Sequence, residues 1–268
     1  MKKWLVGILM ALMISGCAAI NYCDGKYDFS TYRLQRSAES LRMIEHKLYS
    51  IKTVAKLKDK SDGEIVEKTQ TGIAFSVDGK HLIALKHVAA IAEEQVYRTP
   101  FGPVTYTYEK LAETYYLQIP GDDCDEGCEI ELNAKHAENS DISILWHDEW
   151  NFDTLPGKIG NSDEIQVGQS LIVSRTPALL GHGFAYGIVA HPKYWEEAQS
   201  LTTDAEYFGF MLHTNLIGGD SGNPVFAIRD GKLELIGINQ GTFMQMDMSC
   251  ALKINFVMDV VNKLIEDK

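Results

Sequence analysis

The chain has 268 residues, 45% of them hydrophobic, and a formal net charge of −12 with a pI near 5.1. This length and apolar content suffice for a packed core and suit one domain made of two small barrels. The acidity argues against nucleic acid as a partner, because phosphates are bound by basic surfaces. Net charge mostly concerns solubility, so it does not identify a substrate.

The first residues are typical of a bacterial export signal. Two lysines precede the apolar run Trp4–Ile14, which is shorter than the about 20 apolar residues that a spanning helix needs. Ile14-Ser15-Gly16-Cys17 resembles a lipobox, so we expect residues 1–16 to be removed and Cys17 to be lipidated. By resemblance to enterobacterial lipoproteins, Ala18 in place of an aspartate suggests the outer membrane, with the protein facing the periplasm and held by several acyl chains. An uncleaved anchor and a plain signal peptide are the alternatives.

Residues 17–47 are predicted to form a lipidated tether that becomes a helix. An amphipathic stripe supports the helix, and its members are Leu34, Ala38, Leu41, Ile44, Leu48 and Ile51. A stripe this short normally buries against its own domain, so we expect the helix to pack on the surface of the barrel. A short coiled-coil contact is the alternative, and it would need more heptads.

Short strands separated by Gly, Asp and Asn indicate an all-β body over residues 48–268. We place a first barrel at about 48–150, a second at about 158–254, and a C-terminal helix at 255–266. The predicted strands are Gly72–Val77, His81–Leu85, Val104–Tyr108, Tyr115–Ile119, Glu129–Asn133, Ile142–Trp146, Ser170–Ser174, Gly187–Ala190, Phe208–His213, Pro224–Ile228 and Leu233–Asn239.

The stretch Gly218–Pro224 has the composition that a nucleophile in a tight bend requires. Ser221 lies between glycines and follows Asp220. The glycines clear space, so the backbone N–H groups of Gly219 and Ser221 are expected to point at one spot and stabilise an oxyanion. An α/β-hydrolase elbow is excluded, because Asn223 stands where G-x-S-x-G needs a glycine.

A base and an orienting acid for this serine are found upstream. His87 follows the apolar strand His81–Leu85, and Asp141 precedes an alternating strand. The order His, Asp, Ser differs from that of subtilisin and from that of the α/β-hydrolases. The remaining histidines do not end a strand in this context, and Asp148 and Asp153 compete less well with Asp141. These histidines are His46, His81, His136, His147, His182, His191 and His213.

Together these motifs resemble the trypsin-like (chymotrypsin-fold) serine peptidases, and more closely the short bacterial members. The likeness runs from about Thr53 to the C-terminal helix and includes Thr71–Lys80 before His87, Ile159–Ala190, and Leu235–Gly241 after the serine. The resemblance implies two six-stranded antiparallel β-barrels with an N-terminal and a C-terminal helix. It also implies a serine endopeptidase that acts on proteins or peptides through an acyl-enzyme, with no cofactor and no metal.

The same resemblance implies which residues contact the substrate. Asn239, Gln240 and Gly241 would line the cleft and pair with an extended peptide. Asn215 stands six residues before the serine, where a trypsin-like specificity would place an acid, so cleavage after Arg or Lys is not supported. Asp220 must find a partner other than the new N-terminal amine of the activated digestive enzymes, or be solvated, and no zymogen step is implied.

Lipidation of Cys17 would leave four of the five cysteines, and an even number in an exported protein suggests disulfides. Cys124 and Cys128 lie close together in a Gly/Asp-rich loop, so we favour that pair and expect Cys23 to bond with Cys250. Zinc is the alternative, and it is disfavoured because one C-x3-C has no matching pair or nearby histidine set.

Two other functions are compatible with these motifs. One is a trypsin-fold binding or exclusion module of the cell envelope with little or no turnover. The other is an esterase-like acyl transfer at the same site, since a fold does not fix its substrate. An intact set of His87, Asp141 and Ser221 favours the peptidase. The sequence leaves the natural substrate and the oligomeric state open.

Overall fold

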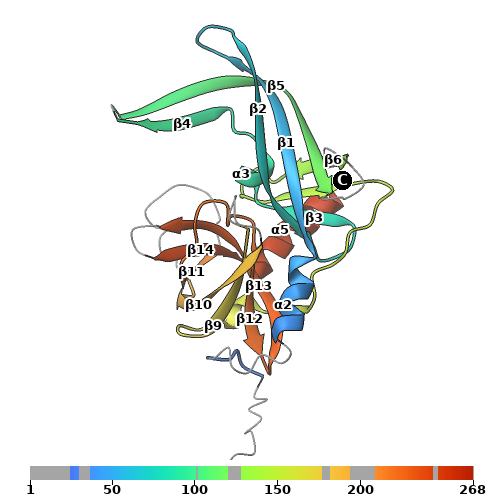
Figure 1. Cartoon of the computed structure of the whole chain (residues 1–268), viewed down its shortest axis with the longest axis vertical. Helices are drawn as coiled ribbons and strands as arrows, with labels where there is room; N and C mark the ends of the chain where they lie inside the picture. Colours follow the sequence, from blue (N-terminus) through green and yellow to red (C-terminus); the bar gives the residue numbers. More distant parts are fainter. Residues whose placement is uncertain are drawn as a thin grey trace, which may run out of the picture.

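The computed structural model describes residues 25–29, 37–100, 102–119, 128–176, 182–193, 209–243 and 247–267, which build two closed β-barrels with flanking helices (Figure 1). The predicted pair of six-stranded antiparallel barrels with helices at both ends is confirmed. Residues 1–24, with the predicted lipidation site Cys17, lie outside the described residues. In the parts of the chain that are described, no helix is long and apolar enough to cross a membrane.

The first barrel follows the order β1-β2-β3-β7-β6-β5 and closes through the pairing of β1 with β5. The seventh strand, β4, pairs with the N-terminal part of β5 and lies outside the closed ring. The strands are β1 (Leu48–Asp59), β2 (Ile65–Ser76), β3 (His81–Ala84), β4 (Glu94–Thr99), β5 (Gly102–Ile119), β6 (Cys128–His136) and β7 (Ser143–Trp146).

The second barrel follows the order β12-β9-β10-β11-β14-β13 and closes through the pairing of β12 with β13. The short strand β8 (Lys158–Ile159) lies parallel to β13 and precedes a single 3-10 turn, η2 (Ser162–Glu164). The ring consists of β9 (Ser170–Arg175), β10 (Gly183–His191), β11 (Gly209–His213), β12 (Pro224–Arg229), β13 (Lys232–Phe243) and β14 (Met248–Lys253).

Two helices cover the junction of the barrels: α2 (Ser37–Glu45) and α5 (Ile254–Glu266). Ile44 of α2 is fully buried, in the same cluster as Phe226 of β12 and Val257 of α5. The expectation that the N-terminal helix packs on its own domain therefore holds. Leu48 and Ile51 of the predicted stripe lie in β1 instead, where burial alternates with the strand period of two.

Several strands are longer than the sequence suggested. One continuous strand, β5, includes both Val104–Tyr108 and Tyr115–Ile119, while β1 and β4 were not predicted at all. The outer halves of these strands extend beyond the barrel as long hairpins (Figure 1). In the outer half of β5 most side chains on both faces are exposed, so the apolar alternation that marks a half-buried strand is weak there.

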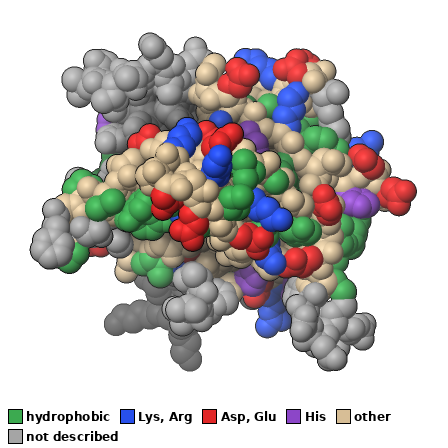
Figure 2. All heavy atoms as spheres, turned by 90° about the horizontal axis from the view of Figure 1, so that it is seen from above, with side chains coloured by type: hydrophobic (Ala, Val, Ile, Leu, Met, Phe, Trp, Pro, Cys, Tyr) green, Lys and Arg blue, Asp and Glu red, His purple; other side chains and the backbone are tan. Residues whose placement is uncertain are grey.

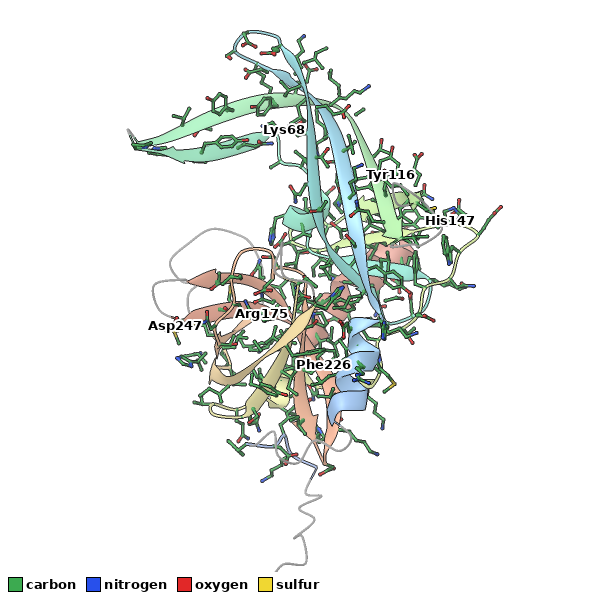
Figure 3. The ribbon with its side chains drawn as sticks, in the orientation of Figure 1. Lys68, Tyr116, His147, Arg175, Phe226 and Asp247 are labelled. Atoms are coloured by element: carbon green, nitrogen blue, oxygen red, sulfur yellow. The ribbon has the colours of Figure 1, made fainter. Side chains whose placement is uncertain are left out.

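Lys68 of β2 fastens the β4–β5 hairpin to the long β1–β2 ribbon (Figure 3). Its ammonium lies 4.4 Å from the ring centre of Tyr108 and 5.3 Å from that of Tyr97. It also donates to the hydroxyl oxygens of Tyr97 and Tyr108 at 3.0 and 3.2 Å. Figure 2 looks down on this end and shows acidic and basic side chains interspersed. The net negative charge is therefore not gathered into one patch on the visible, described part of this face.

Ile44→Ala is expected to lower the free energy of unfolding by about 2–5 kcal/mol, because the lost side chain leaves a cavity between α2 and the shared core. Met43, next to it on the same helix and 45% exposed, provides a matched control. Met43→Ala should stay within about 0.5 kcal/mol of the parent protein in urea unfolding followed by circular dichroism. Equal, small effects of the two substitutions would show that α2 does not dock on the barrels.

Candidate active site

His87 lies in a single helical turn, α3 (Lys86–Ala89), that follows β3. The amides of Val88 and Ala89 both donate to the carbonyl of Leu85, and these two residues face the core. His87 itself turns outward, with its side chain 48% exposed. The strand predicted to run to Leu85 thus ends at Ala84, and the histidine is presented by the helical turn that follows.

Close contact with β2 fixes the position of this turn. A Cβ at Gly72 would lie 1.8 Å from a methyl of Val88, so glycine alone lets β2 approach α3. The side-chain amide of Gln70 donates to the carbonyls of His87 and Val88 at 2.5 and 2.9 Å. The hydroxyl of Thr53 donates to the carbonyl of Ala89 at 2.8 Å. The first barrel therefore satisfies the open carbonyls of the turn that carries His87.

Asp141 holds His87 by both of its carboxylate oxygens. Oδ2 lies 2.6 Å from His87 Nδ1, and Oδ1 accepts from the His87 backbone N–H at 2.8 Å. A carboxylate acceptor at Nδ1 fixes the hydrogen of the neutral imidazole there and leaves Nε2 as the basic nitrogen. Lys86 does not compete for this carboxylate, because its ammonium donates to the carbonyl of Ala137 at 2.8 Å.

The loop that carries Ser221 joins β11 to β12 and depends on glycine at two positions. Gly219 and Gly222 have φ values of +97° and +89°, in the region that favours glycine. A Cβ at Gly222 would lie 2.8 Å from the carbonyl oxygen of Ile73 in β2. The loop is thus pressed against the first barrel. Among the described residues, no acceptor takes a hydrogen bond from the amides of Gly219 or Ser221, which leaves both able to bind an oxyanion.

Asp220 is fully buried, and its partner is Arg175 at the end of β9 (Figure 3). Oδ2 accepts from Arg175 Nε at 3.0 Å and from the amide of Ile217 at 2.9 Å, while Oδ1 accepts from the amide of Thr176 at 3.2 Å. Arg175 is thus the partner of Asp220 that the sequence did not identify. It holds the serine loop in shape without a newly cut N-terminus.

Two asparagines hold the other side of the same loop. The side-chain amides of Asn239 and Asn223 donate to the carbonyl of Asp220 at 2.8 and 3.2 Å. The side chain of Asn239 is buried in this structural contact, and the expectation that its backbone lines the cleft stays a prediction. Asn215 is exposed near the loop and Gly241 pairs with Cys250 in the sheet, so substrate contact by these two residues stays a prediction.

Gln240 connects the two halves of the site. Its backbone carbonyl accepts from Ser221 Oγ at 3.1 Å, and its side-chain amide donates to Asp141 Oδ2 at 3.1 Å. Ser221 and His87 share no hydrogen bond in this arrangement. The structure thus joins His87 to Asp141 directly and Ser221 to Asp141 only through Gln240.

The side-chain role of Gln240 was missed because it depends on a local irregularity. The register between β13 and β14 shifts between Asn239 and Gly241, so Gln240 is the extra residue of a bulge. A β-bulge re-aims a side chain that the regular alternation would place elsewhere. The spacing after Ser221 located the strand correctly, but it could not reveal this change of direction.

Two of the competing histidines have structural partners. His81 Nδ1 lies 2.7 Å from a carboxylate oxygen of Asp78 in the β2–β3 turn. His136 lies between the hydroxyls of Ser143 and Tyr115, where burial lowers its pKa. The competing acid Asp153 pairs with Lys47 at 2.5 Å. These contacts leave His87 and Asp141 as the histidine–carboxylate pair beside the serine loop.

The cysteine expectations are corrected in part. Cys250 carries a free, buried thiol, with Sγ 3.8 Å from the carbonyl of Gly241, so the predicted bond from Cys23 to Cys250 is wrong. The predicted bond fails because Cys250 lies on β14, buried inside the second barrel. Cys128 is disulfide-bonded, while Cys23 and Cys124 lie outside the described residues. No group of His, Cys, Asp and Glu suited to a metal ion occurs among the described residues.

The thiol of Cys250 is expected to resist alkylation in the folded protein. Burial raises its pKa to about 11, so only about 0.1% is thiolate at pH 8, against roughly a quarter for an ordinary thiol. Iodoacetamide at pH 8 without reductant should modify Cys250 in urea and leave it unmodified in the native protein, as read by peptide mass spectrometry. A Cys250 that resists alkylation even in urea, until reductant is added, would contradict the free thiol.

Arg175→Ala is expected to lower the free energy of unfolding by about 3–5 kcal/mol, because it leaves the Asp220 carboxylate buried without its cation. Lys52 forms a partly exposed ion pair with Glu129 at 2.8 Å and provides a control. Lys52→Ala should lower the free energy of unfolding by about 1 kcal/mol at most. Urea unfolding of both variants decides the matter. A near-zero effect of Arg175→Ala would show that the pair does not support the loop.

Comparisons with known proteins agree with this arrangement. No protein-family profile matches the sequence. A probable periplasmic serine endoprotease, DegP-like, from Halomonas elongata is 30% identical over 149 residues, which is 53% of this chain and 29% of the relative. A protein of the same description from Pseudomonas putida is 28% identical over 144 residues, 51% of this chain and 28% of the relative. The chain thus matches less than a third of the length of these relatives.

Solved structures show the same fold. The HtrA-type protease AlgW with a tripeptide superposes with a TM-score of 0.59 at 16% identity, covering 87% of this chain and 64% of that one. AlgW with a decapeptide gives 0.59 at 16% identity, with 87% and 68% covered. The sequence likeness to DegP-like endoproteases and the double barrel shared with HtrA-type proteases agree with the resemblance to the trypsin-like serine peptidases.

Proposed function

We propose that the chain is a serine endopeptidase of the bacterial cell envelope that hydrolyses peptide bonds with Ser221, His87 and Asp141. The observation that carries the proposal is the His87–Asp141 pair, joined by two hydrogen bonds, beside a serine loop whose Gly219 and Ser221 amides have no acceptor among the described residues. This set supplies a base, a group that orients the base, a nucleophile and oxyanion donors.

The reaction begins when Ser221 leaves its contact with the carbonyl of Gln240. An extended peptide pairing with β13 offers that carbonyl an N–H donor, and Oγ then rotates toward His87 Nε2. Oγ attacks the peptide carbonyl as Nε2 takes the serine proton, and the amides of Gly219 and Ser221 stabilise the oxyanion. The loss of one such donor typically lowers the rate by about 10²–10³.

The same histidine completes the reaction. The imidazolium gives its proton to the leaving amine, the acyl-enzyme forms, and water activated by Nε2 releases the acid and restores Ser221. Asp141 stabilises the imidazolium without taking its proton. The side-chain amide of Gln240 fixes the orientation of that carboxylate, from the opposite barrel. Gln240 is therefore a positioning residue in this scheme.

The cell envelope as location rests on two observations. The curated relatives are described as periplasmic, and residues 1–17 have the lysines, apolar run and lipobox of a lipoprotein signal. We infer that Cys17 carries acyl chains and holds the protein at the outer membrane, facing the periplasm. A protein or peptide is the expected partner.

One observation favours a second candidate, a binding or exclusion module with little turnover. The Ser221 hydroxyl is bonded to Gln240 and not to His87, so the resting site lacks the serine–histidine contact. A site of this kind would bind peptides along β13 without activating the nucleophile.

Reaction with a fluorophosphonate probe separates the two candidates. The full chain in detergent should gain one covalent adduct on Ser221, seen by mass spectrometry. Ser221→Ala and His87→Ala should abolish it, because the first removes the nucleophile and the second its base. His147→Ala, at a partly exposed histidine that accepts from the amide of Glu149 and has no hydrogen bond to Ser221, His87 or Asp141, should label like the parent (Figure 3). A folded parent protein that gains no adduct would contradict the peptidase and favour the binding module.

A further inference from the structure

A cavity of about 990 Å³ is lined in part by Gly219, one of the two proposed oxyanion donors. On one side it is lined by Gly219 of the serine loop and by Thr176, which follows β9. On the other side it is lined by β2 of the first barrel, around Ile73. This volume lies at the upper end of the range of ligand pockets and would hold more than one side chain. We call this space the leaving-group pocket.

The position of the pocket relative to Ser221 decides which part of a substrate would enter it. Ser221 Oγ is bonded to Gln240 of β13, the strand along which the acyl part of a peptide would pair. The described lining residues include none from β13 or β14. The serine loop meets β2 on the other side, where Gly222 abuts the carbonyl of Ile73. A chain that crosses the oxyanion amides from β13 therefore continues toward β2 and the pocket.

Polar and charged side chains make up about half of the pocket lining, and the remaining residues form an aromatic and apolar wall. Tyr49 of β1 and Phe152 pack edge to face, with ring centres 5.4 Å apart. The hydroxyl of Tyr49 accepts from the amide of Asp153 at 2.6 Å, which fixes the segment 150–153 against β1. Trp150 stands at the edge with 40% of its surface exposed, and Leu117 and Ile119 of β5 also line the space. A partly exposed indole beside fixed aromatic rings suits a large apolar side chain.

We propose that the leaving-group pocket binds the substrate segment on the C-terminal side of the scissile bond and selects a bulky apolar or aromatic side chain within its first three residues. This inference rests on the proposed peptidase function and adds a substrate class to it. Burial of such a side chain against Trp150, Tyr49 and Phe152 should raise kcat/KM about tenfold to a hundredfold over alanine.

The test is cleavage of a peptide library by the full chain in detergent. The first three residues after the scissile bond are varied, and kcat/KM is measured by mass spectrometry for each peptide. The expected result is a preference of at least tenfold for Phe, Leu or Trp over Ala at one of these positions. Trp150→Ala should reduce that preference to about threefold or less, because it lowers kcat/KM for the Phe, Leu and Trp peptides more than for the alanine peptides.

Two further variants keep the test specific. Thr71 is an exposed residue of β2 that lines the pocket, so Thr71→Trp should narrow the space and weaken the preference from the opposite wall. Tyr186 is an exposed aromatic residue of β10 outside the pocket, and Tyr186→Ala should leave the preference unchanged. Cleavage without the preference, or a preference that survives both Trp150→Ala and Thr71→Trp, would overturn the proposal while the peptidase stands.

If no peptide is cleaved, measurements of peptide binding test the leaving-group pocket. Calorimetric titration with peptides that carry Phe or Ala near a free N-terminus should show at least tenfold tighter binding of the Phe peptide, lost in Trp150→Ala. That result would support the pocket even if the peptidase function failed. Equal binding of the two peptides would overturn it.

Discussion

The chemistry of this chain depends on how two closed barrels meet at one bulge of β13. The first barrel carries His87 and Asp141, and the second carries Ser221, so neither barrel alone holds all three residues of the proposed site. Gln240 bridges them by donating to Asp141 and accepting from Ser221. A shift of one barrel against the other by about 1 Å would break both contacts, since hydrogen bonds weaken steeply with distance and angle. The shared core under α2 and α5 resists such a shift.

A buried charge pair gives the serine loop its own rigidity. Asp220 is fully buried and pairs with Arg175, while its carbonyl accepts from two asparagine amides. Such a carboxylate is tolerated only because its hydrogen bonds are satisfied. The glycines at 219 and 222 then allow the loop to turn and to touch β2. The loop is thus formed by the chain itself, with no role for a cut N-terminus.

The sequence was sufficient to predict a site residue where that residue lies in a local motif made by its neighbours in the chain. The glycines around Ser221, the strand before His87 and the strand after Asp141 located all three residues, because each motif depends on neighbours in sequence. The partner of Asp220, the buried side chain of Asn239 and the turn of Gln240 toward Asp141 were not predicted. Each of them depends on residues about 20 to 100 positions away or on a bulge. The free thiol of Cys250 was missed because burial in a barrel is a tertiary property. Spacing alone predicted none of these contacts.

The central claim is that Asp141 fixes the His87 tautomer with the hydrogen on Nδ1, so that Nε2 is the base that faces Ser221. The most direct measurement is nitrogen-15 NMR of the neutral imidazole in the full chain, assigned by loss of the signals in His87→Ala. The account predicts a protonated Nδ1, with its proton far downfield because of the short contact to Asp141, and an unprotonated Nε2. In Asp141→Asn that downfield proton should disappear. A proton found on Nε2 in the parent protein, or an Nδ1 signal unchanged in Asp141→Asn, would contradict the account.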